Sequence, residues 1–213
     1  MPIQLLSTSP GVFVLWLLAI VFGITVHEFG HALAATMLGD PTARDKGRLT
    51  LNPIAHIDLL GFLMLLFAGF GWGKPTPFNP YNLRIPRWGP AIVGMAGPAM
   101  NLVFVAVFGL AFRVIANMLD LGPENYLMTF LVFLIQINVV LLVFNLLPIP
   151  PLDGSKVLFS VLPAHMDEFR ARFEQQGPFL LLMLIIADNF LGINIFGRIF
   201  GSILDAVGNI IFA

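Results

Sequence analysis

Residues 11–38 read GVFVLWLLAIVFGITVHEFGHALAATML, and this stretch decides the fold class. It is largely apolar, and Glu28 is the single charged residue within it. A helix needs about 20 apolar residues to cross the hydrocarbon core of a bilayer, and this stretch exceeds that length. It therefore predicts a membrane-spanning helix that carries one ionisable carboxylate inside the bilayer.

Further apolar runs continue this pattern along the chain. Two more are long enough to span a bilayer, at about 90–112 and 125–147, and a weaker fourth lies at about 179–199. The stretch 59–72 is apolar but has only 14 residues. As a helix it would be about 21 Å long, which favours a re-entrant segment. The sequence predicts one all-α polytopic membrane domain over 1–213. We expect a three-helix core, the re-entrant segment and one or two additional C-terminal membrane helices.

Composition supports a lipid environment for most of the chain. The 213 residues include 11 basic and 12 acidic ones, so 11% are charged, against roughly a quarter in soluble domains. Hydrophobic residues make up 58%, more than a soluble fold of this length could bury. The net charge of −1 argues against nucleic acid as a partner. The absence of cysteine excludes disulfides and Cys-ligated metal sites.

The distribution of Lys and Arg predicts the topology. Loops 40–58, 73–89 and 148–177 carry three each, and loop 113–124 carries one. If 59–72 enters the bilayer and returns on the same side, the three basic loops share one side of the membrane. If it crosses, the difference in the number of Lys and Arg residues between the two sides nearly cancels. The positive-inside rule therefore favours a re-entrant segment, cytosolic basic loops and an N-terminus outside.

Glu28 is a functional candidate because a charge at membrane depth is costly. Residues 27–31 read His-Glu-Phe-Gly-His, an H-E-x-x-H pattern. On a helix, His27 and His31 lie one turn apart on one face, so both imidazoles can reach one metal ion. Glu28 lies beside them, where it can accept a proton from water at the metal. The pattern predicts a zinc site with a catalytic base.

A tetrahedral zinc with two histidines needs a third protein ligand. His56 and His165 lie in loops, and Asp153 ends the segment NLLPIPPLD at 145–153. The prolines of this segment end the preceding helix, and unwound backbone at membrane depth fits where it lines a wet cavity. Asp153 is therefore a candidate ligand, although Asp-Gly is also a common turn pair.

With both motifs in view, the sequence resembles the site-2 protease family of intramembrane zinc metalloproteases. HEFGH at 27–31 and FNLLPIPPLDG at 144–154 match its two signatures. NPIAHID at 52–58 resembles its N-P-x-x-H-x-D segment, and GPAMN at 97–101 its G-x-x-x-N motif. GWGKP at 71–75 resembles a compact bacterial and archaeal branch, and no segment is long enough for a PDZ domain or a CBS pair.

The resemblance implies that His27, His31 and Asp153 bind one zinc ion per chain and that Glu28 is the catalytic base. It implies membrane-anchored protein substrates that are cut within or next to their spans. It also implies a multi-pass protein in the plasma membrane of a prokaryote, with the active site near the cytosolic side. Two rival classes stay open: a catalytically silent scaffold that binds client spans, and a metal permease.

Other residues are candidates for roles around the metal. We expect Asn145 to stabilise the oxyanion or contact the substrate backbone, with interhelical hydrogen bonding as its alternative. Asn138 lies two turns earlier on the same helix face and is expected to pair helices. His56 either orients substrate or closes a turn, and Asn101 could reach the site. Gly97 is expected to let two helices approach closely.

Overall fold

The computed structural model describes residues 2–119, 121–122, 125–192 and 194–212, and no β-strand occurs among them. Three helices, α2 (Pro10–Met37), α5 (Gly89–Met118) and α6 (Tyr126–Asn145), are long and apolar enough to cross a membrane. They confirm the all-α polytopic membrane fold that the apolar runs predict.

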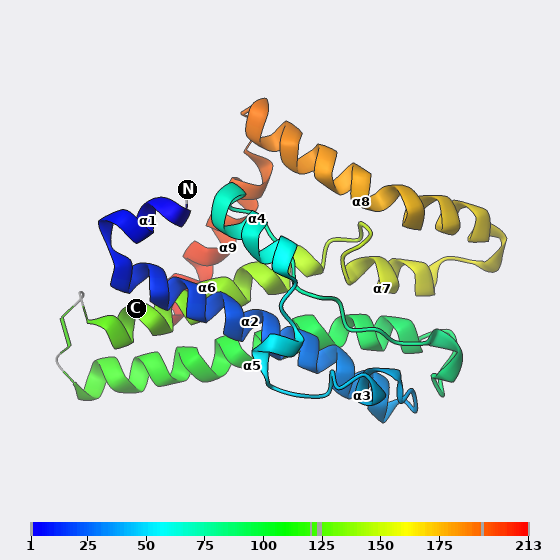
Figure 1. Cartoon of the computed structure of the whole chain (residues 1–213), viewed down its shortest axis with the longest axis horizontal. Helices are drawn as coiled ribbons and strands as arrows, with labels where there is room; N and C mark the ends of the chain where they lie inside the picture. Colours follow the sequence, from blue (N-terminus) through cyan, green and yellow to red (C-terminus); the bar gives the residue numbers. More distant parts are fainter. Residues whose placement is uncertain (1, 120, 123–124, 193, 213) are drawn as a thin grey trace.

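These three helices pack against one another in pairs and form the core of the molecule (Figure 1). Helix α5 runs antiparallel to α2 and α6, so its N-terminal end lies beside their C-terminal ends. Close packing of α2 on α5 depends on Gly30, where a Cβ would lie 2.6 Å from the Ala96 carbonyl oxygen. The outer faces keep large apolar side chains such as Leu102 and Leu110 exposed, as expected of lipid-facing surfaces.

The helix ends follow local signals. Pro10 and Pro90 lie in the first turns of α2 and α5, where a missing N–H costs nothing. Asn125 caps α6 by accepting hydrogen bonds from the backbone N–H groups of Leu127 and Met128. Helix α5 ends at Met118, six residues beyond the expected end at 112, and Arg113 lies exposed within this extension, where a long side chain can carry its charge toward the membrane surface.

Helix α4 (Leu59–Ala68) is the apolar segment predicted to be re-entrant. It is 10 residues long, since the Asp58 carboxylate caps its start and Gly69, with φ 76°, ends it in the left-handed conformation. The chain then returns in extended form, and Gly73 forms an isolated antiparallel bridge with Ile57. The excursion therefore begins and ends at one place, as a re-entrant segment requires.

Short elements connect these parts. They are the helices α1 (Pro2–Thr8), α3 (Thr42–Asp45) and α7 (Gly154–Val161) and the 3₁₀ turns η1 (Pro53–Ala55), η2 (Pro80–Asn82) and η3 (Ala164–Met166). Helix α7 packs against α5 and places the loop after α6 beside α2.

The C-terminal region forms two helices, α8 (Asp167–Phe190) and α9 (Ile195–Ile211). The prediction of one continuous span over 179–199 is wrong, because α8 ends at Phe190 and a second helix begins at Ile195. Gly192 has φ 64°, and the Asp188 carboxylate accepts hydrogen bonds from the N–H groups of Ile195 and Phe196 at 2.5 and 3.2 Å. This cap starts a new helix, and α9 packs against α5 and α6.

Candidate metal centre

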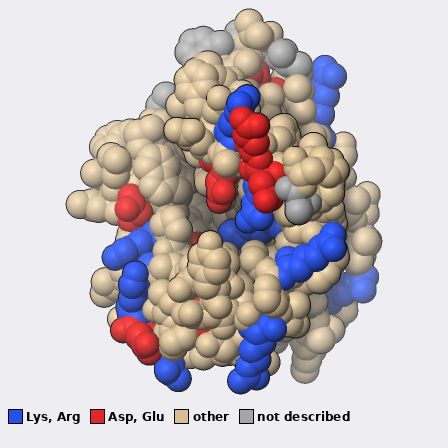
Figure 2. Space-filling view, turned by 90° about the vertical axis from the view of Figure 1, so that its right-hand side faces the viewer, with Lys and Arg blue, Asp and Glu red and all other residues tan. Residues whose placement is uncertain are grey.

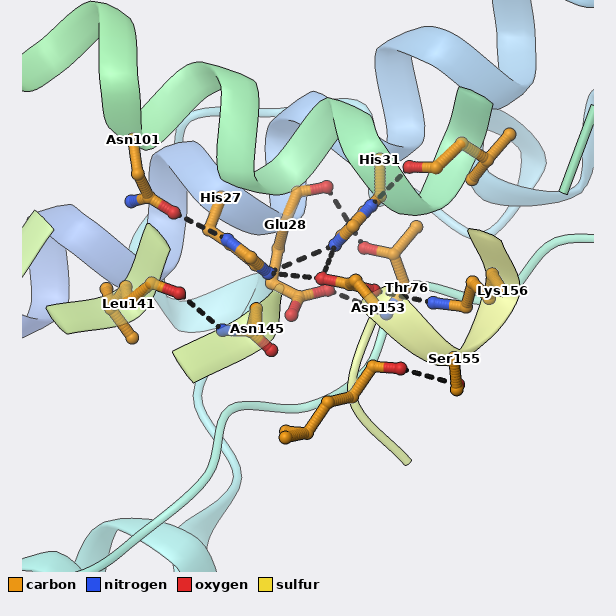
Figure 3. A network of polar contacts seen from close by, with 12 residues as sticks. His27, Glu28, His31, Thr76, Asn101, Leu141, Asn145, Asp153, Ser155 and Lys156 are labelled. Carbon is orange, nitrogen blue, oxygen red and sulfur yellow. Dashed lines mark hydrogen bonds and ion pairs between the residues drawn. The ribbon is translucent and has the colours of Figure 1, made fainter. Parts of the chain in front are cut away.

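His27 and His31 point from α2 toward the loop that follows α6 (Figure 3). Their ring centroids lie 4.7 Å apart, and their Nε2 atoms are separated by 3.1 Å. Both residues are buried. The i, i+4 spacing therefore brings two imidazole nitrogens to one point, as the sequence pattern predicts.

Asp153 completes the cluster from the loop that follows α6. Its Oδ2 atom lies 3.0 Å from His27 Nε2 and 3.1 Å from His31 Nε2. The proline-containing loop after α6 turns back toward α2, and a Cβ on Gly154 would lie 2.3 Å from the Leu146 carbonyl oxygen. Among the described residues, these three form the group that could hold a metal ion.

The protonation pattern of the histidines fits a bound cation. His27 Nδ1 lies 2.6 Å from Asn101 Oδ1, and His31 Nδ1 lies 2.7 Å from the Val93 carbonyl oxygen. Both partners are acceptors, so each Nδ1 donates a proton and each Nε2 presents a lone pair. These two lone pairs and the Asp153 carboxylate converge at 3.0–3.1 Å. Tetrahedral zinc spaces its ligand atoms by roughly 3.3 Å, so the donor set suits this ion.

Two buried asparagines fix the orientation of His27. Asn101 donates from Nδ2 to Asn138 Oδ1 at 2.7 Å and to the Gly23 carbonyl oxygen at 3.2 Å, which turns its Oδ1 toward the imidazole. Asn138 donates to the Leu134 carbonyl oxygen at 2.7 Å. The structure therefore places Asn101 in contact with a candidate ligand and Asn138 one hydrogen bond further away. Such outer partners orient metal ligands and set their basicity.

Gly97 makes room for both imidazoles. A Cβ at this position would lie 2.4 Å from His31 Nε2 and 2.7 Å from His27 Cε1. Gly97 therefore does more than let two helices pack closely. Its absent side chain leaves the space in which the candidate ligands meet.

Glu28 lies beside the cluster without joining it. Its side chain is 12% exposed, and its Oε2 atom accepts a hydrogen bond from the Thr76 N–H at 2.7 Å. The Thr76 hydroxyl donates to the Glu28 carbonyl oxygen at 3.1 Å, and Arg48 Nη2 lies 3.9 Å from Oε2. The arrangement separates the three candidate ligands from a carboxylate that can move a proton.

Asn145 and His56 occupy different positions relative to the cluster. Asn145 is the last residue of α6, and its Nδ2 donates to the Leu141 carbonyl oxygen on its own helix at 3.0 Å (Figure 3). His56 is fully buried, and its Nε2 lies 2.8 Å from the Thr50 carbonyl oxygen. Its Nδ1 faces Arg48 at 3.4 Å. These contacts favour the turn-closing alternative for His56.

Sequence reasoning missed three residues that contact the site: Arg48, Thr76 and Lys156. Lys156 Nζ lies 2.6 Å from Asp153 Oδ1, the oxygen that faces away from the histidines. The i, i+3 spacing of this pair was visible in the sequence; the contacts of Arg48 and Thr76 depend on tertiary folding.

Two cavities are lined by residues that lie next to the site, Gly73 beside Glu28 and Lys156 beside Asp153. An apolar cavity of about 400 Å³ is lined by residues that include Ile24, Trp72 and Gly73. A second cavity of about 1020 Å³ is lined by charged residues of both signs, Lys156 among them. Figure 2 shows the end of the molecule at which α3 and α7 lie, where Lys and Arg side chains surround a hollow that also holds Asp and Glu.

Comparisons with known proteins identify zinc metalloproteases as relatives of this chain. The model of Peptidase family M50 matches residues 115–187. "Putative zinc metalloprotease YwhC" of Bacillus subtilis is 38% identical over 172 residues, which cover 79% of this chain and 78% of that protein. "Putative zinc metalloprotease Rip2" of Mycolicibacterium smegmatis is 34% identical over 182 residues, 83% of this chain and 68% of the relative.

An archaeal protein is similar as well. "Putative zinc metalloprotease MJ0611" of Methanocaldococcus jannaschii is 31% identical over 147 residues, which cover 69% of this chain and 70% of the relative. No solved structure matches the chain. The identity to YwhC and its coverage of both chains establish the family. This membrane protein therefore belongs to peptidase family M50, the site-2 protease family, as the two sequence signatures predict.

Proposed function

We propose that the chain is a zinc-dependent endopeptidase that cuts membrane-anchored proteins within or next to their spanning segments. The convergence of His27, His31 and Asp153 beside Glu28, inside a bundle of three apolar helices, carries this proposal. The names of the relatives support zinc as the metal. We expect one ion per chain and a location in the plasma membrane of a prokaryote, with the site near the cytosolic side.

Glu28 is the proposed catalytic base. A zinc ion held by the three ligands supplies Lewis acidity toward the scissile carbonyl and lowers the pKa of water. Glu28 takes the proton of the attacking water and passes it to the leaving amine nitrogen. Oε2 of Glu28 accepts a hydrogen bond from the Thr76 N–H. In the described part of the chain no group donates to Oε1, so this oxygen is available for the proton.

Asn145 is the proposed donor to the developing oxyanion. One N–H of its amide is used by the Leu141 carbonyl oxygen, and the amide has a second N–H that can be offered to substrate. A neutral donor placed at the point where negative charge develops stabilises the transition state more than the ground state.

The apolar cavity is the proposed place for the substrate segment. It lies between α2, α4 and α6, and Gly73 lines it while also lying next to Glu28. A spanning helix keeps its carbonyl groups hydrogen-bonded, so the substrate must unwind near the scissile bond. Residues 70–73, which are not helical, offer backbone groups against which an unwound segment can pair as a strand.

The rival classes fit the site less well. A scaffold has no use for a carboxylate kept beside the ligands within the bilayer, where such a group is costly. A permease needs polar groups along its whole path, whereas the cavity on one side of the cluster is lined mainly by apolar residues.

Purified chain in proteoliposomes with a single-span model protein tests the proposal and separates the three classes. We expect a cut within or next to the span, identified by mass spectrometry, which a zinc chelator abolishes and added zinc restores. Binding of the span without a product would indicate the scaffold. Zinc uptake into sealed vesicles without a product would indicate the permease.

A further inference from the structure

A short extended segment, residues 73–77 with the sequence Gly-Lys-Pro-Thr-Pro, passes directly over the catalytic base; we name it the strap. Pro75 and Pro77 have no N–H and fix their own φ angles, so the strap is stiff here. Thr76 supplies the single N–H of residues 75–77, and this N–H binds Glu28 Oε2 at 2.7 Å. Residues 75–77 thus have one backbone donor, the Thr76 N–H, and it binds Glu28 Oε2.

Arg48 holds the strap through two of its carbonyl groups. Its Nη2 donates to the Lys74 carbonyl oxygen, and its Nη1 donates to the Pro75 carbonyl oxygen at 3.2 Å. These are the two carbonyls that precede Thr76, so the guanidinium fixes the peptide that carries the Thr76 N–H. A planar fork of donors can bind two neighbouring carbonyls at once, which a lysine ammonium cannot do with the same geometry.

The placement of Arg48 is costly. The residue is 5% exposed, and its Nε is the buried side-chain atom without a hydrogen-bond partner among the described residues. Burial lowers the pKa of Arg48 below its ordinary value, and the charge of Glu28 acts in the opposite direction. Burying a guanidinium is unfavourable unless its contacts compensate for the lost hydration. Here the strap carbonyls and the carboxylate of Glu28, 3.9 Å away, are the groups that compensate for the burial of the guanidinium.

The strap also connects the base to the apolar cavity. Gly73, its first residue, lines that cavity, and a Cβ on Gly73 would lie 4.0 Å from Glu28 Oε1. Lys74 donates its N–H to the His56 carbonyl oxygen at 2.8 Å, which anchors this end of the strap. The same stretch therefore touches the place proposed for the substrate and the group that moves the proton.

We infer that Arg48 is a positioning residue for catalysis. Its hydrogen bonds to the Lys74 and Pro75 carbonyl oxygens fix the position of the Thr76 N–H. The Thr76 N–H in turn aligns the Glu28 carboxylate for proton transfer. The inference rests on the proposed function, since it assigns Arg48 a part in the same reaction. A small misplacement of a reacting group can lower the rate about 100-fold without loss of binding. Arg48 thus acts on kcat and leaves the metal ligands unaffected.

Kinetics of Arg48→Met and Arg48→Lys test this role, with Arg44→Met as the control from the same loop, because the Arg44 side chain is 60% exposed. We expect kcat of Arg48→Met to fall about 100-fold, with KM within about threefold of wild type and zinc content unchanged. Arg48→Lys should stay at least about tenfold below wild type. The control should match wild type. An unchanged kcat, or a loss of zinc that parallels the loss of kcat, would overturn the inference.

Hydrogen–deuterium exchange supplies a readout that does not depend on cleavage. Residues 75–77 contribute one exchanging amide, that of Thr76, and it should exchange faster in Arg48→Met than in wild type and Arg44→Met. Equal protection in all three proteins would refute the positioning role, even if wild type cleaves. If wild type cleaves no substrate, the proposed function fails, while the exchange measurement still decides whether Arg48 fixes the strap.

Discussion

The imidazole of His27 is held at Nδ1 and presents Nε2 to Asp153. Nδ1 meets Asn101 Oδ1 at 2.6 Å, and Nε2 meets Asp153 Oδ2 at 3.0 Å. Because Asn101 uses its own N–H groups on Asn138 and Gly23, its oxygen cannot turn away without breaking two hydrogen bonds. A single amide thus fixes the tautomer that leaves His27 Nε2 free to bind a metal.

Removing this amide should weaken metal binding. Asn101→Leu has a similar volume but no acceptor for His27 Nδ1, so we expect the zinc affinity to fall by about 10–100-fold. Competition with a chelator of known affinity measures the change. Asn209→Leu, an exposed replacement of the same kind on α9, should leave the affinity unchanged. Equal affinities for the two variants would rule out this role of Asn101.

Asn145 offers a second test at this scale. If its free N–H stabilises the oxyanion, Asn145→Ala should lower kcat by roughly 10²–10³ with zinc retained. If it serves only helix packing, the loss should appear in the melting temperature, with kcat nearly intact. Steady-state kinetics beside a melting curve of the same protein distinguishes the two roles.

At the scale of elements, local patterns were the part that sequence could predict. The spacing of His27 and His31 fixes their common face on any helix, and the prolines after Asn145 end α6 whatever surrounds them. The contact between Glu28 and Thr76 joins residues 48 positions apart, so no local pattern could reveal it. The break at Gly192 was hidden because apolar residues continue on both sides of it.

Gly97 was read as a packing residue because small residues commonly serve that purpose in membrane helices. Its contact with the imidazoles depends on how α5 is rotated. Gly97→Ala should displace His31 or push α5 from α2, since the new Cβ would lie 2.4 Å from His31 Nε2. We expect at least a tenfold loss of zinc affinity. Gly201→Ala on α9, where no atom lies within 4 Å, is the matched control. Zinc affinity of Gly97→Ala equal to that of the control would contradict the structure at this point.

At the scale of the whole molecule, charge and structure support one orientation. Lys and Arg gather at the end of the bundle seen in Figure 2. The pairing of Ile57 with Gly73 brings the two ends of the α4 segment together, which supports the proposal that the loops before and after α4 lie on one side of the membrane. From the positive-inside rule we propose that this side is cytosolic and that the candidate metal centre lies near it.

Single cysteines test this topology, because the chain has none of its own. Exposed positions 46, 84 and 170 should react with an impermeant thiol reagent only from the cytosolic face. Position 119, which follows the end of α5, should react only from outside. Labelling of 46 and 84 from opposite faces would mean that α4 crosses the membrane.

The joint assignment of His27, His31 and Asp153 as ligands and Glu28 as base is tested most directly by measuring zinc content and cleavage on the same samples. Glu28→Gln should retain about one zinc per chain and lose cleavage, because the ligands remain while the base is gone. His31→Ala should lose both. Full cleavage by Glu28→Gln, or unchanged zinc in both His27→Ala and His31→Ala, would contradict the assignment.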